Sequence, residues 1–264
     1  MSFYAKSFVY NGTPSELFNI QVASIDSGGA VNSPGSGTVE IVENYVYKRK
    51  SPFFYGVKYT SKLQFPISFF SPDEIDAQTF SYLQNWLFGQ LNYKNFVLIQ
   101  PDMDSFYLRV IFTEPNVIRA GNIIYGLQGT CIMDSQFAYT YPKTTIYNYT
   151  SVPSGSQIVI NNDSHYAGYL YPEMTFRMSA SGSALSIINT SDNNREFLFS
   201  GLSPNEVITI NNDLGIVTSS LLIPRLSVFN KHFLRFAPGI NILSVTGGIS
   251  QMTLTYQFAR RLGG

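Results

Sequence analysis

Apolar side chains recur at helical spacing in one stretch of the chain, residues 71–90, and this pattern predicts a helix. Its broad apolar face is formed by Ile75, Thr79, Tyr82, Leu83, Trp86 and Leu87, with Phe80 and Leu91 widening it. The narrow opposite side carries Gln78, Ser81, Asn85 and Gly89. Ser71, Pro72 and Glu74 match the N-cap, N1 and N3 positions of a capping box, and Gly89 provides a C-terminal stop.

Trp86 is the only tryptophan of the sequence and lies in the middle of the apolar face. Large aromatic side chains usually pack in a core, so we expect Trp86 to anchor the helix to a sheet. The alternative is that Trp86 faces a partner protein. The width of the apolar face favours the core position, which leaves Gln78, Ser81 and Asn85 as the helix surface available to another molecule.

The rest of the first half reads as strands separated by turns. The predicted strands are residues 8–10, 17–25, 39–47, 57–70, 96–99, 106–112, 116–119 and 123–133. Asn11–Gly12 and Gly121–Asn122 are typical of tight turns between paired strands. Residues 24–37, which include Gly28 and Gly29, are too rich in Gly and Ser to pack and predict a long exposed loop or arm.

A basic triplet, Lys48–Arg49–Lys50, follows the predicted strand at residues 39–47. Three adjacent cationic side chains at a strand end usually form a solvated turn. The functional alternative is that Lys48, Arg49 and Lys50 contact an acidic surface of a partner protein.

The pattern changes near Pro142, where we place a boundary between two domains, residues 1–142 and 143–264. The second part contains no helical stretch and reads as short strands about ten residues apart, which is typical of an antiparallel sandwich. The predicted strands are residues 145–149, 157–161, 173–180, 184–189, 195–200, 207–210, 215–218, 233–236, 241–245 and 251–259. The pattern Ile-x-Ile-Asn-Asn occurs at 158–162 and 208–212, too short to establish an internal repeat.

Composition narrows the classes of function. Lys plus Arg and Asp plus Glu both number 17, so the chain lacks the basic excess that general nucleic-acid or anionic-membrane binders need. Charged residues make up only 13% of the chain, whereas 18 Tyr and 21 Phe are present. This balance suits a protein whose surface is partly covered by other protein. The first residues resemble no signal peptide, and no apolar run approaches the roughly 20 residues of a transmembrane helix.

The sequence offers no constellation for catalysis or metal binding, and we expect no catalytic residue, metal site or cofactor. Cys131 is the single cysteine and lies in a strand-like run, as a buried small apolar side chain does. His165 and His232 have no partner at ligand spacing. Asp102 and Asp104 flank a methionine in a predicted turn, with no downstream Glu at calcium-loop spacing.

A second reading of the sandwich is carbohydrate binding, because such folds can stack sugars on exposed aromatic rings. Tyr166, Tyr169 and Tyr171 lie close together in the sequence and are the candidates. The alternative is a tyrosine-rich edge or loop in a protein interface. The second function considered is therefore a β-sandwich protein that adheres to host surface glycans.

The order of several motifs resembles the distal tail proteins of siphophages, the hub proteins of the tail tip. The motifs are Tyr10–Gly12, residues 49–56, 85–88, 129–132, 187–191, 197–211 and 229–243. The last run, two strand-like segments around Pro238–Gly239, is the most specific. The resemblance covers nearly the whole chain and rests on the order of the motifs rather than on any one of them.

The resemblance implies a mainly β fold: an N-terminal β-sandwich or split-barrel domain with one α-helix, then a C-terminal galectin-like antiparallel β-sandwich. It also implies a homohexameric ring in the virion tail tip that joins the tail tube protein to the tail-tip protein. In the family the outer domains can carry receptor-binding proteins. On this reading Gln78, Ser81, Asn85, Lys48–Lys50, Gly28 and Gly29 are candidate contacts between subunits or with partners.

Overall fold

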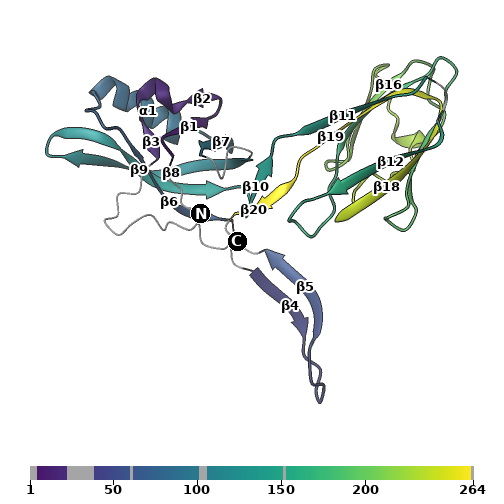
Figure 1. Ribbon diagram of the computed structural model, residues 1–264, viewed down its shortest axis with the longest axis horizontal. Coiled ribbons are helices and arrows are strands. Elements are labelled where there is room, and N and C mark those ends of the chain that lie inside the picture. Colours follow the sequence, from purple (N-terminus) through teal and green to yellow (C-terminus); the bar gives the residue numbers. More distant parts are fainter. Residues whose placement is uncertain (1–4, 23–38, 60–61, 101–105, 151–152, 263–264) are drawn as a thin grey trace. The chain divides into compact units, whose positions relative to one another are not determined.

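The computed structural model describes residues 5–22, 39–59, 62–100, 106–150 and 153–262. The chain forms two compact units, residues 1–140 with 261–264 and residues 141–260 (Figure 1). Each unit has its own hydrophobic core. The fold is mainly β, with one α-helix in the described residues, as the sequence predicted.

The first unit is built around a curled antiparallel sheet with the strand order β2-β1-β7-β8-β9-β6-β3. The ends of this order meet, because Ala5, just before β1, exchanges two backbone hydrogen bonds of 3.0 Å with Val22 in β3. The sheet therefore approaches a split barrel. Its strands are β1 (Ser7–Tyr10), β2 (Thr13–Pro14), β3 (Gln21–Val22), β6 (Gln64–Phe70), β7 (Lys94–Ile99), β8 (Phe106–Ala120) and β9 (Ile123–Met133), with β10 (Phe137–Thr140) beside β8.

The helix α1 spans Ala77–Phe88, so it begins six residues later than the sequence predicted. The predicted capping box at Ser71, Pro72 and Glu74 is wrong. The actual N-cap is Asp76, whose Oδ1 accepts hydrogen bonds from the backbone amides of Gln78 (2.9 Å) and Thr79 (3.0 Å). Ser71 and Ile75 instead donate their amides to carbonyl oxygens at the start of β9, and this pairing holds their segment outside the helix.

The predicted core position of Trp86 is confirmed. Trp86 is 7% exposed and lies with Leu83 and Leu87 in the core of the first unit. Its ring packs against the rings of Phe8 and Phe18, with centroids 6.0 and 5.1 Å away. The apolar face is narrower than predicted, because Tyr82 is 56% exposed and Leu91, beyond the helix, is 94% exposed.

The strand predicted at residues 57–70 is two strands in different sheets. Residues 53–59 form β5 (Phe53–Tyr59), which pairs with β4 (Val39–Asn44) in a separate two-stranded sheet. Residues 64–70 form β6, which pairs with β9 in the curled sheet. The sequence pattern indicates strand at both places but not which strand each one pairs with, so it could not show that the partners differ.

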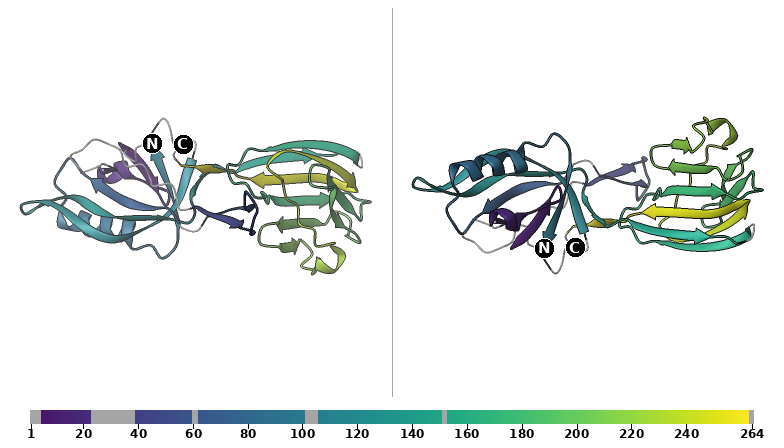
Figure 2. Two further views of the ribbon diagram at one scale, coloured as in Figure 1. Left: turned by 90° about the horizontal axis from the view of Figure 1, so that it is seen from below. Right: turned by 90° about the horizontal axis from the view of Figure 1, so that it is seen from above.

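The second unit is the predicted antiparallel sandwich (Figures 1 and 2). One sheet has the order β11-β19-β13-β16-β17 and the other the order β12-β18-β14-β15. Alternate side chains of both sheets fill one core. The strands are β11 (Lys143–Asn148), β12 (Ser154–Asn162), β13 (Glu173–Met178), β14 (Leu185–Asn189), β15 (Arg195–Phe199), β16 (Val207–Asn211), β17 (Ile216–Ser219), β18 (Gly239–Gly247) and β19 (Ile249–Tyr256).

The chain then returns to the first unit. After β20 (Ala259–Arg261), Leu262 is 6% exposed and belongs to the core that also contains Trp86. Two short 3-10 helices, η1 (Ser15–Phe18) and η2 (Leu226–Val228), complete the described elements. The strand predicted at residues 233–236 is wrong, since that segment forms only an isolated bridge between Phe236 and Leu170.

Candidate interaction surfaces

The hairpin of β4 and β5 carries large apolar side chains that no core covers. Among residues 40–56 and Lys58, whose side chains the structure describes, none belongs to either hydrophobic core. Tyr47 is 88% exposed and Phe54 is 64% exposed, and the other exposed apolar side chains are Ile41, Val42, Tyr45, Val46, Phe53 and Tyr55. A two-stranded hairpin is marginal alone, and a contiguous exposed apolar surface marks a contact site.

The basic triplet lies in the turn of this hairpin, where Lys48, Arg49 and Lys50 are all exposed. The Arg49 guanidinium lies over the Phe53 ring at 3.5 Å from its centroid, and the Lys48 ammonium lies 5.4 Å from the centroid of Tyr47. The cations therefore share one surface with the aromatic side chains. The tip of the hairpin can bind a surface that offers both an apolar area and carboxylates.

A second surface is a groove of about 490 Å³ between α1 and β8. Ser81 and Asn85, two of the three polar helix residues singled out in the sequence, line it together with Glu114. Gln78 is exposed one turn earlier on the helix and does not line the groove.

A bulge in β8 shapes the far wall of this groove. The pairing of β8 with β9 shifts register between Thr113 and Asn116, and Glu114 adopts a φ of 58°. The carboxylate of Glu114 accepts a 2.8 Å hydrogen bond from the Thr130 hydroxyl. A bulge bends the strand and aims its side chains away from the regular ladder. The sequence pattern predicted two separate strands here, residues 106–112 and 116–119, and did not indicate Glu114 as a groove residue.

Gly129 lets the helix approach the sheet closely beneath the groove. A Cβ at Gly129 would lie 2.4 Å from Cε1 of Phe88, the last helix residue, and 2.6 Å from the Thr113 carbonyl oxygen. A larger residue would therefore push the helix off the sheet.

Of the other predicted contact residues, Gly28 and Gly29 lie outside the described residues.

The three candidate tyrosines of the second unit are exposed, and the structure connects two of them to Arg235. The Arg235 guanidinium covers one face of the Tyr169 ring at 3.7 Å from its centroid. The Tyr171 hydroxyl lies close enough to the same guanidinium to contribute to its raised pKa. Tyr166 lies in the same segment, where its backbone amide donates to the Ser164 hydroxyl. One aromatic face that could stack a sugar is therefore already occupied.

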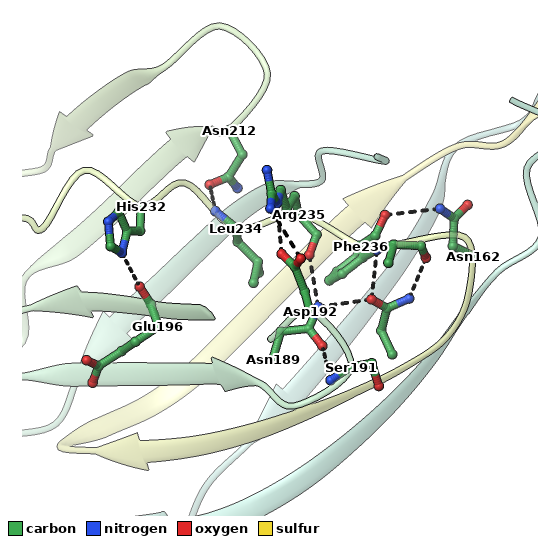
Figure 3. A network of polar contacts seen from close by, with 12 residues as sticks. Asn162, Asn189, Ser191, Asp192, Glu196, Asn212, His232, Leu234, Arg235 and Phe236 are labelled. Carbon is green, nitrogen blue, oxygen red and sulfur yellow. Dashed lines mark hydrogen bonds and ion pairs between the residues drawn. The ribbon is translucent and has the colours of Figure 1, made fainter. Parts of the chain in front are cut away.

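Buried asparagines fix the connection that contains Arg235 (Figure 3). Oδ1 of Asn212 accepts from the Leu234 amide (2.8 Å), and Nδ2 of Asn162 donates to the Phe236 carbonyl (3.1 Å). Nδ2 of Asn189 donates to the Arg235 carbonyl (3.1 Å). These bonds replace the strand pairing that the sequence predicted for residues 233–236. Sequence reasoning missed the three asparagines, although two of them end the Ile-x-Ile-Asn-Asn patterns.

An ion pair completes the anchorage of this connection. Nε of Arg235 donates to Oδ2 of Asp192 (2.8 Å) and Nη2 donates to Oδ1 (3.2 Å), and the Asp192 side chain is almost fully buried. The hydrogen bonds to Asp192 raise the pKa of the Arg235 guanidinium above its ordinary value. The guanidinium is therefore charged at every physiological pH, and its hydrogen bonds to Asp192 hold it against Tyr169.

Two family descriptions cover both units. Residues 3–135 match the family described as "Phage tail protein N-terminal domain", and residues 139–256 match the one described as "Phage tail C-terminal domain". The chain belongs to these phage tail proteins. The resemblance seen in the sequence motifs is thereby confirmed at the level of the family. No curated protein matches the tail protein by sequence.

Solved structures share the fold of this tail protein at very low identity. The crystal structure of the SPP1 Dit protein, called a paradigm of the hub adsorption apparatus in phages that infect Gram-positive bacteria, aligns with a TM-score of 0.69 and 9% identity. The alignment covers 96% of the tail protein and 98% of the SPP1 chain. A chain of the activated phage P2 baseplate with Ca aligns with a TM-score of 0.52 and 10% identity, over 93% and 92% of the two chains.

The described residues add two observations on possible chemistry. They contain no group of three or more His, Cys, Asp or Glu side chains placed to hold a metal ion. Burial raises the pKa of the Cys131 thiol, which lies fully buried in the first core, so the reactive thiolate is disfavoured. Among these residues, no helix has the length and apolar character to cross a membrane.

Proposed function

We propose that this tail protein is a structural hub subunit, without catalytic activity, of the virion tail tip. It assembles into a homohexameric ring that joins the tail tube protein to the tail-tip protein and supports the machinery of host adsorption. The family match and the fold shared with SPP1 Dit and a P2 baseplate chain support this role. The observation that carries it is the hairpin of β4 and β5, whose apolar side chains lack a core of their own.

In this proposal the two units have different roles. The first unit, within residues 1–142, forms the ring, because it carries the hairpin and the groove between α1 and β8. The second unit, within residues 143–264, is a galectin-like outer sandwich that can carry a receptor-binding protein. Ring closure requires two different faces on each subunit, and the hairpin and the groove supply such a pair of faces.

The ring is tested by light scattering and electron microscopy of the purified full chain. We expect a hexameric mass and six-fold particles with a central channel. The double variant Tyr47→Ser and Phe54→Ser removes two exposed aromatic side chains of the hairpin, and we expect it to lose the hexamer. Its melting temperature should stay that of the wild type, because neither residue contributes to a core.

The matched control is Leu214→Ser, which removes an exposed apolar side chain (68% exposed) from the second unit. We expect this variant to form rings as the wild type does. A wild-type protein that stays monomeric at every concentration, alone and with tube or tip protein, would refute the proposed function.

A further inference from the structure

A polar pocket of about 410 Å³ opens in the second unit, beside the segment fixed by the asparagines. It is lined by Asp192, Asn193, Asn194, Arg195, Glu196, Asn230, His232 and Arg235, all of them polar or charged. Most of the lining comes from the turn between β14 and β15 and from the connection before β18. The neighbouring positions of Glu196, His232 and Arg235 are visible in Figure 3.

The turn between β14 and β15 fixes the rim of the pocket. The Arg195 amide donates to the Asp192 carbonyl oxygen (2.9 Å), and the two residues between them, Asn193 and Asn194, have φ angles of 51° and 54°. Asparagine tolerates this left-handed conformation, which closes the turn tightly. Both side chains are exposed at the rim, where their amides can donate and accept hydrogen bonds.

The charges of the lining are unequally compensated. Both carboxylate oxygens of Asp192 accept from Arg235, so these two charges are paired. The Glu196 carboxylate has only a neutral donor, the Ser186 hydroxyl at 2.6 Å from Oε1, and no ion-pair partner among the described residues. Among the described residues, no carboxylate lies within ion-pair distance of Arg195. The Nε of Arg195 is also buried without a hydrogen-bond partner in that part of the chain.

Arg195 lines the pocket as a permanent cation without an ion-pair partner among the described residues, so its guanidinium can hold an anionic ligand there. A planar guanidinium matches the oxygens of a carboxylate or a phosphate. The rim amides of Asn193 and Asn194 suit hydroxyl groups, which also donate and accept. We propose that this pocket binds the carboxylate or phosphate group of an acidic saccharide, with Arg195 holding the anion and the two asparagines holding sugar hydroxyls.

The site lies wholly within the second unit, so the proposal does not depend on ring assembly. It also differs from stacking on Tyr166, Tyr169 or Tyr171, because the anion binds to Arg195 rather than to an aromatic face. Arg235 serves as a wall that Asp192 holds in place.

Calorimetric titration of the full chain with three matched sugars tests the proposal. Glucuronic acid carries a carboxylate, glucose 6-phosphate carries a phosphate, and glucose carries neither. We expect at least one of the two acids to bind and glucose to give no measurable heat. Which acid binds distinguishes a carboxylate-bearing from a phosphate-bearing ligand.

The variant Arg195→Gln should weaken binding of the acidic sugar by about tenfold or more, because a charge-assisted hydrogen bond is lost. Arg177→Gln removes an exposed arginine from the other sheet and should bind as the wild type does. The double variant Asn193→Gly and Asn194→Gly keeps the left-handed turn and removes the amides. It should weaken binding of the acidic sugar and leave the weaker binding of inorganic phosphate unchanged.

The proposal is overturned if neither acid binds at tens of millimolar, or if Arg195→Gln binds as tightly as the wild type. Binding of inorganic phosphate as tight as that of glucose 6-phosphate, unaffected by the asparagine variant, would overturn the saccharide assignment. An unchanged melting temperature of Arg195→Gln shows that lost binding does not reflect unfolding.

Discussion

At the scale of single residues, buried polar side chains hold the connections of the second unit in place beside its apolar core. Asn241 alone joins four groups: its Oδ1 accepts from the Ala237 amide and from Asn189, and its Nδ2 donates to the carbonyl oxygens of Ala237 and Gly239. Such bonds satisfy backbone groups that would otherwise be buried without partners. The two Ile-x-Ile-Asn-Asn patterns have the same structural role. The second asparagine of each pattern, Asn162 or Asn212, bonds to the backbone of residues 234–236.

The adjacent pair Asn161 and Asn162 offers a direct test of this role. Asn162 is buried and bonds to the Phe236 carbonyl and the Ser164 amide, whereas Asn161 is exposed. We expect Asn162→Ala to lower the free energy of unfolding of the second unit by about 1–3 kcal/mol. Asn161→Ala, the control, should stay within about 0.5 kcal/mol of the wild type. Urea denaturation measures both, and equal effects would contradict the role of Asn162.

A buried ion pair makes the stability of the second unit dependent on pH. The carboxylate of Glu206 accepts hydrogen bonds from Arg225 (2.7 and 2.8 Å) and from the Ser219 hydroxyl (2.6 Å). Burial would raise the pKa of Glu206, but the hydrogen bonds from Arg225 and Ser219 outweigh it and hold the pKa below its ordinary value. A depressed carboxyl pKa stabilises the folded state above the unfolded pKa, and this contribution is lost as the pH falls through the folded pKa.

We therefore expect the free energy of unfolding of the second unit to fall as the pH is lowered below about 4.3, the ordinary pKa of a glutamate. Glu206→Gln should have a shallower acid decline and lose about 3 kcal/mol at pH 7, because Arg225 keeps its charge without a carboxylate. The exposed carboxylate of Asp213 provides the control Asp213→Asn, which should follow the wild-type profile. Thermal unfolding between pH 3 and pH 7 distinguishes the two variants.

At the scale of elements, the local sequence pattern was sufficient to predict an element that packs against the core through one face. The apolar stripe of α1 predicted the helix and the burial of Trp86, because helical periodicity records which side meets the core. The start of α1 could not be predicted, since the amides of Ser71 and Ile75 bond to carbonyl groups about fifty residues later in the sequence. The prediction of a single strand at residues 57–70 was wrong for the same reason. A strand-like pattern indicates a strand, but it does not show which strand pairs with it.

Some parts of the candidate surfaces could be predicted from the sequence and others could not. The polar face of the helix and the exposed basic triplet follow from residue type and spacing, and Ser81 and Asn85 do line a groove. The opposite wall depends on the bulge at Glu114, which no local signal announces. The pocket at Arg195 is assembled from two segments that only the sandwich brings together, so its residues could not be grouped from the sequence.

Replacing Trp86 tests the anchorage of α1. We expect Trp86→Ala to lower the free energy of unfolding of the first unit by about 3–5 kcal/mol, because it leaves a cavity among Phe8, Phe18 and the other core rings. Tyr82→Ala, on the same helix but half exposed, should cost much less. Chemical denaturation followed by near-UV circular dichroism measures both. A Trp86→Ala variant as stable as the wild type would contradict the core position.

At the scale of the whole molecule, assembly is proposed to use a hairpin that offers apolar and cationic side chains and a groove whose lining includes the carboxylate of Glu114. These two faces have complementary character, which favours contact between different surfaces of adjacent subunits. The low overall charge of the chain is consistent with such contacts, because few charges must be desolvated.

Cations placed on the helix surface test the groove as an assembly face. We expect Gln78→Arg with Asn85→Arg to leave the melting temperature unchanged, since both positions are exposed, and to reduce the hexameric fraction in light scattering. The control places two arginines on an exposed strand face of the second unit, Gln157→Arg with Asn161→Arg, and should assemble normally. Normal rings from the helix variant would exclude this face from the subunit contact.

The return of the chain to the first unit determines the order in which the protein can be completed on the ribosome. Leu262 fills a place in the first core, yet it is synthesised after the whole of residues 141–260. Domains usually fold as they emerge, the N-terminal one first. Here the unit made first must wait for residues that follow the sandwich in the sequence, while the inserted sandwich is already complete. A nascent chain therefore cannot present a finished first unit to its neighbours until translation has passed the sandwich, which delays contact between partly made subunits.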